Sequence, residues 1–576
     1  MPPRRAPQPA STRPPHASQS KSIPKPKPKP HSTALAEPLK RQPTALPPAR
    51  THAASYHWPL LLNDKEGCDA LLVWFEGVEE KREMPWRKKW VDPEGVEGRV
   101  LGRRAYEVWV SEIMLQQTRV LTVIPYFKNW ISKWPTVYDL AQADHDEVLS
   151  VWKGLGYYSR ATRLHQGAQA MVANNRDFCP IPSSAEELQG FPGIGRYTAG
   201  AISSIAFGEA EPVLDGNVAR VLSRQIGLYV NVKDKKCNDF LWSVADKLVK
   251  HVSDFPNTKT SAVPGNWNQA LMELGSTTCT PRPKCDDCPI QSTCRAYSEG
   301  QILTEQLTTP SIVPDIEDAC SMCAQLDTED LLTATIDEEE DGKTTKKRKV
   351  EPKKSNPISH HFKLRTSTTH QPGTEDNDED DSCSTINGSK KRKAPESTLK
   401  SKSTAAYCAL FPKKVAKKKV TEGECVVCIV ELCLPGEANS KWLIEQRPAT
   451  GLLASLWQFP QRAITTLNST ALDRKILAQK FLPCLDSRPM DLMKVTAFRV
   501  LLSKAKHVAE IDSLVHVFSH FKLTMHVHLF RIDIDKDNHL DYTLDPGRRW
   551  VDTESMDRET LSTGMQRCWS RTQRAL

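Results

Sequence analysis

Two carboxylates in this chain have sequence surroundings that should give them different proton affinities. Glu112 lies in a segment predicted to be helical, 105–118, on the same face as Val108 and Leu115. A carboxyl group on an apolar face loses hydration, so its pKa should rise and it could hold a proton near neutrality. Asp215 directly precedes a second predicted helix, whose positive end favours the ionised form. Such a pair suits glycoside hydrolysis, with one group as the acid and the other stabilising a cation.

A glycine-containing turn at 191–199 could bind the backbone of a nucleic acid. It contains Gly193 and Gly195 and opens a predicted helix. Glycine lets the backbone approach a ligand closely, and the N–H groups at a helix start bind phosphate. Each feature also has an ordinary explanation when taken alone. Most Gly-x-Gly pairs are plain turns, Glu112 could be a surface residue, and Asp215 could be a helix cap.

Composition divides the chain into folded and unfolded parts. At 576 residues it is too long for one hydrophobic core, so two globular domains and linkers are expected. Residues 1–55 form a basic, proline-rich segment that should be disordered, since residues 1–50 contain ten Lys or Arg against one acid, Glu37. This composition hints at a mitochondrial transit sequence, although prolines oppose the helix of such sequences. No apolar run approaches the length that spans a membrane.

Both carboxylates lie in the first of two domains that differ in their predicted secondary structure. Residues 56–298 are dense in helix-period apolar positions and predict an all-α domain. Residues 423–576 carry strand signals and predict a mixed α/β domain. In it, residues 425–430 should form a buried strand, and residues 521–530 alternate as a strand with one buried and one wet face.

Residues 299–422 predict a long, mostly disordered linker, because acidic runs, basic runs, serine and threonine dominate them. The linker contains Lys-Lys-Arg-Lys-Val at 346–350 and Lys-Lys-Arg-Lys at 390–393. Such clusters are recognised by nuclear import machinery or bind nucleic acid, the alternative being a solvated charge run. We expect a nuclear protein, with the mitochondrion as a second candidate location.

The sixteen cysteines do not resemble a secreted disulfide scaffold in a chain this long. Four of them lie close together in a segment rich in proline and basic residues, at positions Cys279, Cys285, Cys288 and Cys294. Four thiolates at this density suit an iron–sulfur cube or a tetrahedral zinc. A second Cys-x-x-Cys pair, Cys320 and Cys323, stands at the head of the linker.

Six strings in one order resemble the MutY branch of the helix-hairpin-helix DNA glycosylases. They are Met-Pro-Trp-Arg (84–87), Val-Ser-Glu-Ile-Met-Leu-Gln-Gln-Thr (110–118), Gly-Leu-Gly-Tyr-Tyr-Ser-Arg (154–160), Pro-Gly-Ile-Gly-Arg-Tyr-Thr-Ala-Gly-Ala-Ile (192–202), Asp-Gly-Asn-Val-Ala-Arg (215–220) and Asn-Gln-Ala-Leu-Met-Glu-Leu-Gly (268–275). The second domain resembles the Nudix-like recognition domain of the same family, most clearly at 451–460.

The resemblance implies a base excision repair enzyme that removes adenine mispaired with 8-oxoguanine, and also with guanine, by hydrolysis. The adenine must first be flipped out of the duplex. By the same resemblance, Glu112 protonates the adenine and later activates water, and Asp215 stabilises the sugar cation. Tyr197 and Asn217 match the residues that arrange this pair.

Eight further residues match family positions that contact DNA. They are Trp86, Arg87 and Glu273 for the adenine pocket, Gln117 and Tyr157 for the wedge in the base stack, and Phe518, Ser519 and His520 for the loop at 8-oxoguanine. An aromatic ring and an amide suit the wedge, because one stacks and the other hydrogen-bonds an orphaned base.

Tyr197 stands where relatives that also cut the DNA strand carry a lysine. A phenol cannot form the Schiff base of that reaction, so we predict base removal without lyase chemistry. Tyr197 and the second domain oppose a bifunctional endonuclease III-like enzyme, and Glu112 with Asp215 opposes a lesion reader without catalysis. A nucleotide-pool hydrolase lacks support because only Asp473, and no cluster of glutamates, follows residue 460.

For metals, the resemblance implies a [4Fe–4S] cluster on Cys279, Cys285, Cys288 and Cys294. Five residues separate Cys279 from Cys285 where the family usually has six, and the loop presents Arg282 and Lys284 toward DNA phosphate. It also implies a linker zinc on Cys320 and Cys323 with His57, the alternative being two ordinary cysteines. The further upstream cysteine of the family pattern is not found in this chain.

The resemblance also suggests partners besides double-stranded DNA. They are the sliding clamp, the checkpoint clamp through residues 314–317, and an abasic-site endonuclease, with the protein itself a monomer. We find no clear clamp-binding box of the Gln-x-x-aliphatic-x-x-aromatic-aromatic type.

Overall fold

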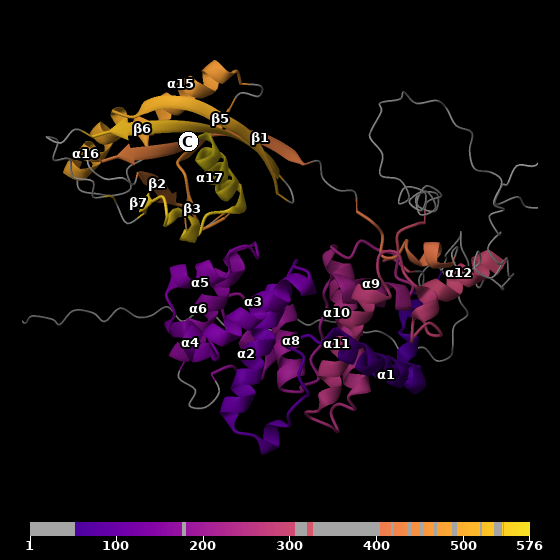
Figure 1. Cartoon of the computed structure of the whole chain (residues 1–576). Helices are drawn as coiled ribbons and strands as arrows, with labels where there is room; N and C mark the ends of the chain where they lie inside the picture. Colours follow the sequence, from indigo (N-terminus) through magenta and orange to yellow (C-terminus); the bar gives the residue numbers. More distant parts are fainter. Residues whose placement is uncertain are drawn as a thin grey trace, which may run out of the picture.

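The computed structural model describes a helical domain, parts of the following linker and a sheet domain (Figure 1). The described residues are 52–174, 180–305, 320–326, 404–415, 420–434, 440–448, 451, 453–465, 469–485, 492–518, 521–534, 544 and 547–576. The basic clusters at 346–350 and 390–393, the segment 314–317, Ser519 and His520 lie outside them. None of the described helices is both long and apolar enough to cross a membrane.

The first domain is built from α-helices, as the apolar periodicity predicts. Their bounds are α1 Lys65–Arg82, α2 Gly98–Leu115, α3 Val120–Lys133, α4 Val137–Gln142, α5 His145–Val151, α6 Ser159–Ala173, α7 Ala185–Leu188, α8 Arg196–Ala206, α9 Gly216–Gln225, α10 Lys235–Val252, α11 Ala262–Thr277 and α12 Arg295–Glu305. Short 3₁₀ turns lie at Ala54–His57, Leu60–Asn63, Pro93–Gly95 and Cys285–Asp287.

Helix α2 lies in the interior and packs against α3, α6 and α8. Its residues 104–114 are all buried, as expected of a core helix. Large aromatic side chains are buried here, including Trp109 of α2 itself and Trp130, whose indole N–H donates to the Tyr106 hydroxyl at 3.0 Å. Because Glu112 belongs to this helix, its carboxyl group cannot avoid the interior.

Close helix contacts bring α8, α9 and α11 around the same point. At Gly200 of α8 a Cβ would lie 2.2 Å from the carbonyl oxygen of Pro212, and at Gly275 of α11 it would lie 2.7 Å from Cβ of Asn217. Both helices therefore approach their neighbours more closely than any other residue would permit. This packing fixes the chain on either side of Asp215.

Parts of the predicted linker belong to the first domain. Helix α12 runs to Glu305, beyond the predicted boundary at 298. Residues 320–326 and 404–412 also pack on this domain, in a cluster that includes Tyr229, Tyr407 and Phe411. Figure 1 draws the segment 404–415 in orange beside α12.

The second domain contains a seven-stranded sheet, which confirms the predicted mixed α/β class. The strands are β1 Thr421–Cys433, β2 Lys441–Gln446, β3 Trp457–Gln458, β4 Gln461–Ile464, β5 Lys506–Val517, β6 Phe521–Asp533 and β7 Arg548–Asp552, and the helices are α15 Ala471–Phe481, α16 Leu492–Ser503 and α17 Thr563–Ala575. The order is β3-β2-β1-β6-β5, with β4 on β1 and β7 on β2. The long central strands β1 and β6 are parallel, with Cys425 opposite Met525.

Both faces of the sheet are covered, which corrects one prediction. Residues 425–430 are buried, as expected. The predicted wet face of β6 is wrong, because α15 and α16 contribute to a second apolar cluster on that side of the sheet, while α17 covers the other. His526 and His528 are therefore buried. Ser513 Oγ lies 2.8 Å from Nδ1 of His526, and burial lowers the pKa of His528 to about 4, so that imidazole is neutral at pH 7.

Candidate active site

The carboxyl group of Glu112 is buried and hydrogen-bonded. The residue is 7% exposed, and the Tyr197 hydroxyl donates to its Oε2 at 2.7 Å. Burial raises the pKa of Glu112 to about 7, the charge of Asp215 adds to the rise, and the hydrogen bond from Tyr197 opposes it. This direction is the one that the sequence predicts for Glu112. This group can both donate and accept a proton at physiological pH.

Asp215 is the N-cap of α9, as the sequence predicts. Its Oδ1 accepts the Val218 backbone N–H at 2.7 Å, and its Oδ2 accepts the Asn217 amide at 2.9 Å. The hydrogen bonds at the helix end favour the ionised form of Asp215, as expected, but they do not determine its pKa alone. Burial is the larger effect and raises the pKa of Asp215, while the hydrogen bonds from Val218 and Asn217 lower it. The carboxyl group lies inside the site, where removal from water counts for more than on a surface cap.

Two of the three residues expected at the adenine pocket, Arg87 and Glu273, form a pair, and the charge of Arg87 acts on Glu112. Glu273 is 2% exposed and pairs with Nη2 of Arg87 at 2.7 Å and with Arg82. Nη1 of Arg87 is buried and has no hydrogen-bond partner among the described residues, so it can donate to a ligand. Trp86 is buried with its ring edge against Phe127. The sequence reasoning missed Arg82, which had no distinguishing local signal.

The two expected wedge residues share an uncommon backbone conformation. Gln117 has φ 58° and Tyr157 has φ 48°, both in the left-handed region. The Tyr157 side chain is 49% exposed. For residues other than glycine this conformation costs on the order of 1–3 kcal/mol and persists only when the surroundings impose it. Strain at two such positions is typical of a ligand-contacting site.

Arg160 supplies the surroundings that hold both wedge loops. Its buried guanidinium donates to the carbonyl oxygens of Ile113, Met114 and Gln116, and to that of Gly156 at 3.0 Å. It also lies over the rings of Trp152 and Tyr157. A planar fork with five donors is suited to this bridging, which a lysine cannot reproduce. Arg160 is the last residue of the shared string 154–160, but the sequence alone did not predict this role.

The turn before α8 is open to a ligand at Gly195. Gly193 has φ +81°, and a Cβ there would lie 2.8 Å from Cβ of Arg163, so a side chain is excluded twice. Gly195 caps α8, and a Cβ at this position would meet nothing within 4 Å. The first N–H groups of α8 can therefore approach a phosphate, as the sequence predicts.

The four clustered cysteines line one cavity despite their shortened spacing. Arg224 donates to Sγ of Cys279 at 3.2 Å and to the backbone of the same loop. Among the described residues, these four cysteines are not in the group of side chains that could hold a single metal ion. Four thiolates around one cavity suit a multi-iron cube.

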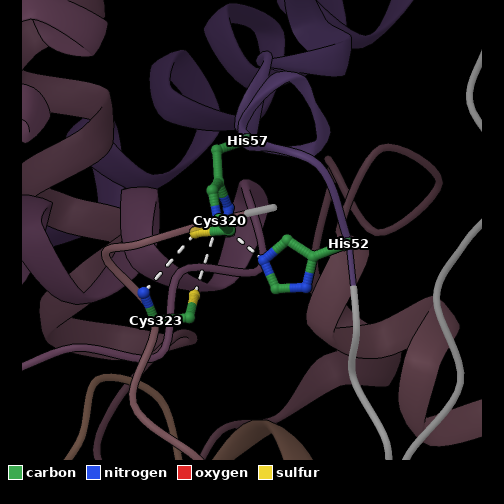
Figure 2. Close-up of side chains that lie close together, drawn as sticks. All are labelled: His52, His57, Cys320 and Cys323. Carbon is green, nitrogen blue, oxygen red and sulfur yellow. Dashed lines mark hydrogen bonds between the residues drawn. The ribbon is translucent and has the colours of Figure 1, made fainter. Parts of the chain in front are cut away.

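A second group of side chains could hold a single metal ion (Figure 2). The ligand atoms of His52, His57, Cys320 and Cys323 all lie within 4.8 Å of one another. His57 Nε2 is 3.4 Å from each sulfur and 3.0 Å from Nε2 of His52. Its Nδ1 lies 2.8 Å from the Ile226 carbonyl oxygen, which fixes the tautomer that leaves Nε2 for a metal. Two cysteines and two histidines are a common zinc set.

Sequence reasoning found three of these four ligands and missed His52. It looked for an upstream cysteine, and the structure instead brings a histidine to that place. A second histidine five residues before His57 was the available signal.

In the second domain the structure describes Phe518 but neither Ser519 nor His520. The Phe518 N–H donates to the Phe521 carbonyl at 2.7 Å, which closes the turn between β5 and β6. Asp473 is the third residue of α15 and forms a capping box with Thr470. It is the sole acidic residue of α15, and its oxygen is engaged in the cap.

Two family descriptions match the chain. Residues 110–246 match the HhH-GPD superfamily of base excision DNA repair proteins, and residues 434–571 match the NUDIX domain. The fold and site therefore define a helix-hairpin-helix base excision repair protein with a Nudix-like domain. Within that class, the chain belongs to the adenine DNA glycosylase family.

The family assignment rests on curated relatives that match most of the chain. The adenine DNA glycosylase of Homo sapiens is 34% identical over 538 residues, which are 92% of this chain and 78% of that one. The enzyme of Rattus norvegicus is 35% identical over 86% of this chain and 76% of its own length. The enzyme of Arabidopsis thaliana is 31% identical over 81% of this chain and 57% of its own length.

Solved structures resemble each domain separately. A thermostable thymine-DNA glycosylase covers 40% of this chain and 96% of its own, with 24% identity and a TM-score of 0.32. The C-terminal domain of mouse MUTYH, from a complex with human PCNA, covers 27% of this chain and 88% of its own, with 23% identity and a TM-score of 0.19.

Replacing Arg160 by lysine should loosen both wedge loops while keeping the charge. We expect base flipping, followed by the fluorescence of 2-aminopurine beside the target adenine, to fall at least about tenfold, since small misplacements at an active site are costly. An Arg531→Lys variant, which alters a partly exposed pair with Glu431, is the control. Wild-type flipping in Arg160→Lys would contradict the bridging role.

Proposed function

We propose that this protein hydrolyses the N-glycosidic bond of adenine mispaired with 8-oxoguanine, and also with guanine, without cutting the strand. The observation that carries the proposal is the buried pair of carboxyl groups. Tyr197 holds Glu112, whose pKa is about 7, and Asp215 caps α9 close enough for its charge to raise that pKa. Two carboxyl groups exposed on a surface would both be ionised and would not supply this acid at neutral pH.

The residues of the site suit the successive steps of this hydrolysis. The protonated Glu112 donates its proton to a ring nitrogen of the adenine as the bond to the sugar breaks. The Asp215 carboxylate stabilises the positive charge that develops on the sugar, and its hydrogen bonds from Val218 and Asn217 favour the ionised form that this requires. Glu112, now ionised, accepts a proton from the attacking water.

The hydroxyl of Tyr197 supports a monofunctional enzyme. It lies against Glu112, at the place where a lyase would need an amine to attack the sugar. Among the described residues of the site, the cations Arg82 and Arg87 are guanidinium groups engaged with Glu273. Neither is a nucleophile at neutral pH, because a guanidinium is not deprotonated in proteins.

The Nudix-like domain supports reading of the base opposite adenine. Its helix α15 carries one acid, used as a cap, so a divalent cation for hydrolysis has no cluster of ligands there. Phe518, whose N–H donates to the Phe521 carbonyl, belongs to the segment that the family resemblance assigns to 8-oxoguanine. Recognition without hydrolysis is the function that this combination favours.

The proposed activity is tested by adenine release from duplexes with 8-oxoguanine, guanine or thymine opposite the target. We expect release in that order, and a loss on the order of 10²–10⁴ for Glu112→Gln, whose amide cannot transfer the proton. Borohydride added during the reaction should trap no covalent complex. The proposed mispair specificity would be refuted by equal release opposite thymine, and the role of Glu112 by undiminished release in Glu112→Gln. Efficient trapping would refute the absence of lyase chemistry.

The rate of adenine release should depend on the protonation of Glu112. Since burial raises the pKa of Glu112 to about 7, the acid form is present below that pH and is lost as the pH rises through it. Tyr197→Phe removes a hydrogen bond that favours the ionised form, so the alkaline limb of the single-turnover profile should move to higher pH. Tyr138→Phe, at an exposed tyrosine, is the control. Superimposable profiles for Tyr197→Phe and wild type would exclude this coupling.

We also propose that Cys279, Cys285, Cys288 and Cys294 hold a [4Fe–4S] cluster. The shared cavity supports this choice, and among the described residues the four cysteines lie outside the group that could hold a single metal ion. Such a cluster would supply a rigid anchor for the loop of Cys279 to Cys294. The loop carries the exposed side chains of Arg282 and Lys284, which suit contacts to DNA phosphate.

For the second group of ligands we propose one zinc ion. The wild-type protein should contain about one zinc per chain by elemental analysis, and His52→Ala should lower its affinity at least about tenfold, since one of four ligands is lost. His145→Ala is a matched control, because His145 lies 3.3 Å from His165 in a pair without cysteines. A zinc-free wild type, or wild-type affinity in His52→Ala, would exclude the site.

We propose a nuclear location from the basic clusters at 346–350 and 390–393, with a mitochondrial fraction as the second possibility. Contacts with a sliding clamp, a checkpoint clamp or an abasic-site endonuclease stay predictions from the resemblance. The segments to which we assigned these signals lie outside the described residues.

A further inference from the structure

A fifth cysteine completes the cavity of the four clustered cysteines. Cys408 comes from the far end of the predicted linker, more than 100 residues later in the chain, and it lines the same cavity. It is 1% exposed, and its thiol hydrogen-bonds the Cys285 side chain. Cys285 is the residue that follows the shortened loop. Nothing in the local sequence around Cys408 predicts this position.

The main chain around Cys408 is held from three sides. The Tyr407 hydroxyl donates to Oε2 of Glu299 in α12 at 2.7 Å, and Arg224 Nε of α9 donates to the Phe411 carbonyl at 3.1 Å. The Lys413 N–H donates to the carbonyl of Val230 at 3.0 Å. Residues on either side of Cys408 are therefore tied to the catalytic domain, and the thiol has a defined place.

Two of the residues that hold this segment, Arg224 and Glu299, make further contacts within the helical domain. Arg224 donates to Sγ of Cys279 as well as to Phe411, so one buried cation connects the cluster loop to the segment 404–412. Glu299 accepts from both Tyr407 and Tyr56. At Gly300, a Cβ would lie 3.1 Å from Thr404, which shows how closely the segment is packed on α12. The segment 404–412 is therefore an integral part of the helical domain.

We propose that the Cys408 thiol hydrogen-bonds a ligand of the iron–sulfur cluster without binding iron itself, and that the segment 404–412 closes the cluster site. The inference rests on the proposed [4Fe–4S] cluster. The thiol donates its S–H to the ligating sulfur of Cys285, which withdraws negative charge from the cluster and favours its reduced state. The packed segment keeps water and oxidants from the iron. Both effects belong to the outer shell, which tunes a metal site without coordinating it.

The proposal is tested on the full-length protein by the visible absorbance and iron content of Cys408→Ala and Cys408→Ser. Both variants should keep four irons per chain. Cys408→Ala should bleach about tenfold faster with ferricyanide or an iron chelator and show a lower cluster reduction potential, since it loses an outer-shell partner. Cys408→Ser keeps a donor and should lie between Ala and wild type. Cys568→Ser, at a buried cysteine of the second domain, should behave as wild type.

Tyr407→Phe separates closure from hydrogen bonding. It removes the tie to Glu299 and leaves the thiol, so bleaching should accelerate while the potential stays at the wild-type value. Wild-type bleaching and potential in Cys408→Ala would overturn the proposal. So would loss of the cluster from folded Cys408→Ala, since Cys408 would then be a ligand, or a wild-type protein without iron. Adenine release, measured in parallel on wild type, tests the proposed function separately.

Discussion

The structure depends on keeping one carboxyl group away from water. An ionisable group in an apolar interior is costly unless it is protonated or hydrogen-bonded. Glu112 meets both conditions, with its pKa near 7 and the Tyr197 hydroxyl at 2.7 Å. The site therefore requires the buried stretch 104–114 of α2 and an α8 that can approach it closely. The glycine contacts of α8 and α11 follow from that requirement, because they draw Tyr197 and Asp215 toward the same interior point.

Features that depend on neighbours in sequence could be predicted from the chain. The helical domain, the N-cap position of Asp215, the buried strand at 425–430 and the four-cysteine cavity all follow from local patterns. Features set by distant packing could not. The pKa of Asp215 depends on burial by elements far from its own helix, and the polar face of β6 is buried because helices cover it.

Arg160 and Cys408 illustrate the same limit for single residues. Each has an ordinary local sequence, and each acquires its position from segments that are far away in the chain. Arg160 reaches carbonyl groups 44 to 47 residues upstream. Cys408 meets a cavity whose other cysteines end at Cys294. Family strings can contain such residues without revealing what they hold, because the strings are read one at a time.

The two metal-binding candidates differ in the length of chain that each encloses. Cys279 to Cys294 form a local loop, whereas His57 and Cys320 are separated by 263 residues. A metal ion on the second group would act as a clasp around the whole helical domain, and in theory cross-links that close long loops restrict the unfolded chain most. Loss of the ion would release the start of the helical domain, with His52 and His57, and the start of the linker, with Cys320 and Cys323, together. Chelation of this ion would therefore increase the conformational freedom of both segments.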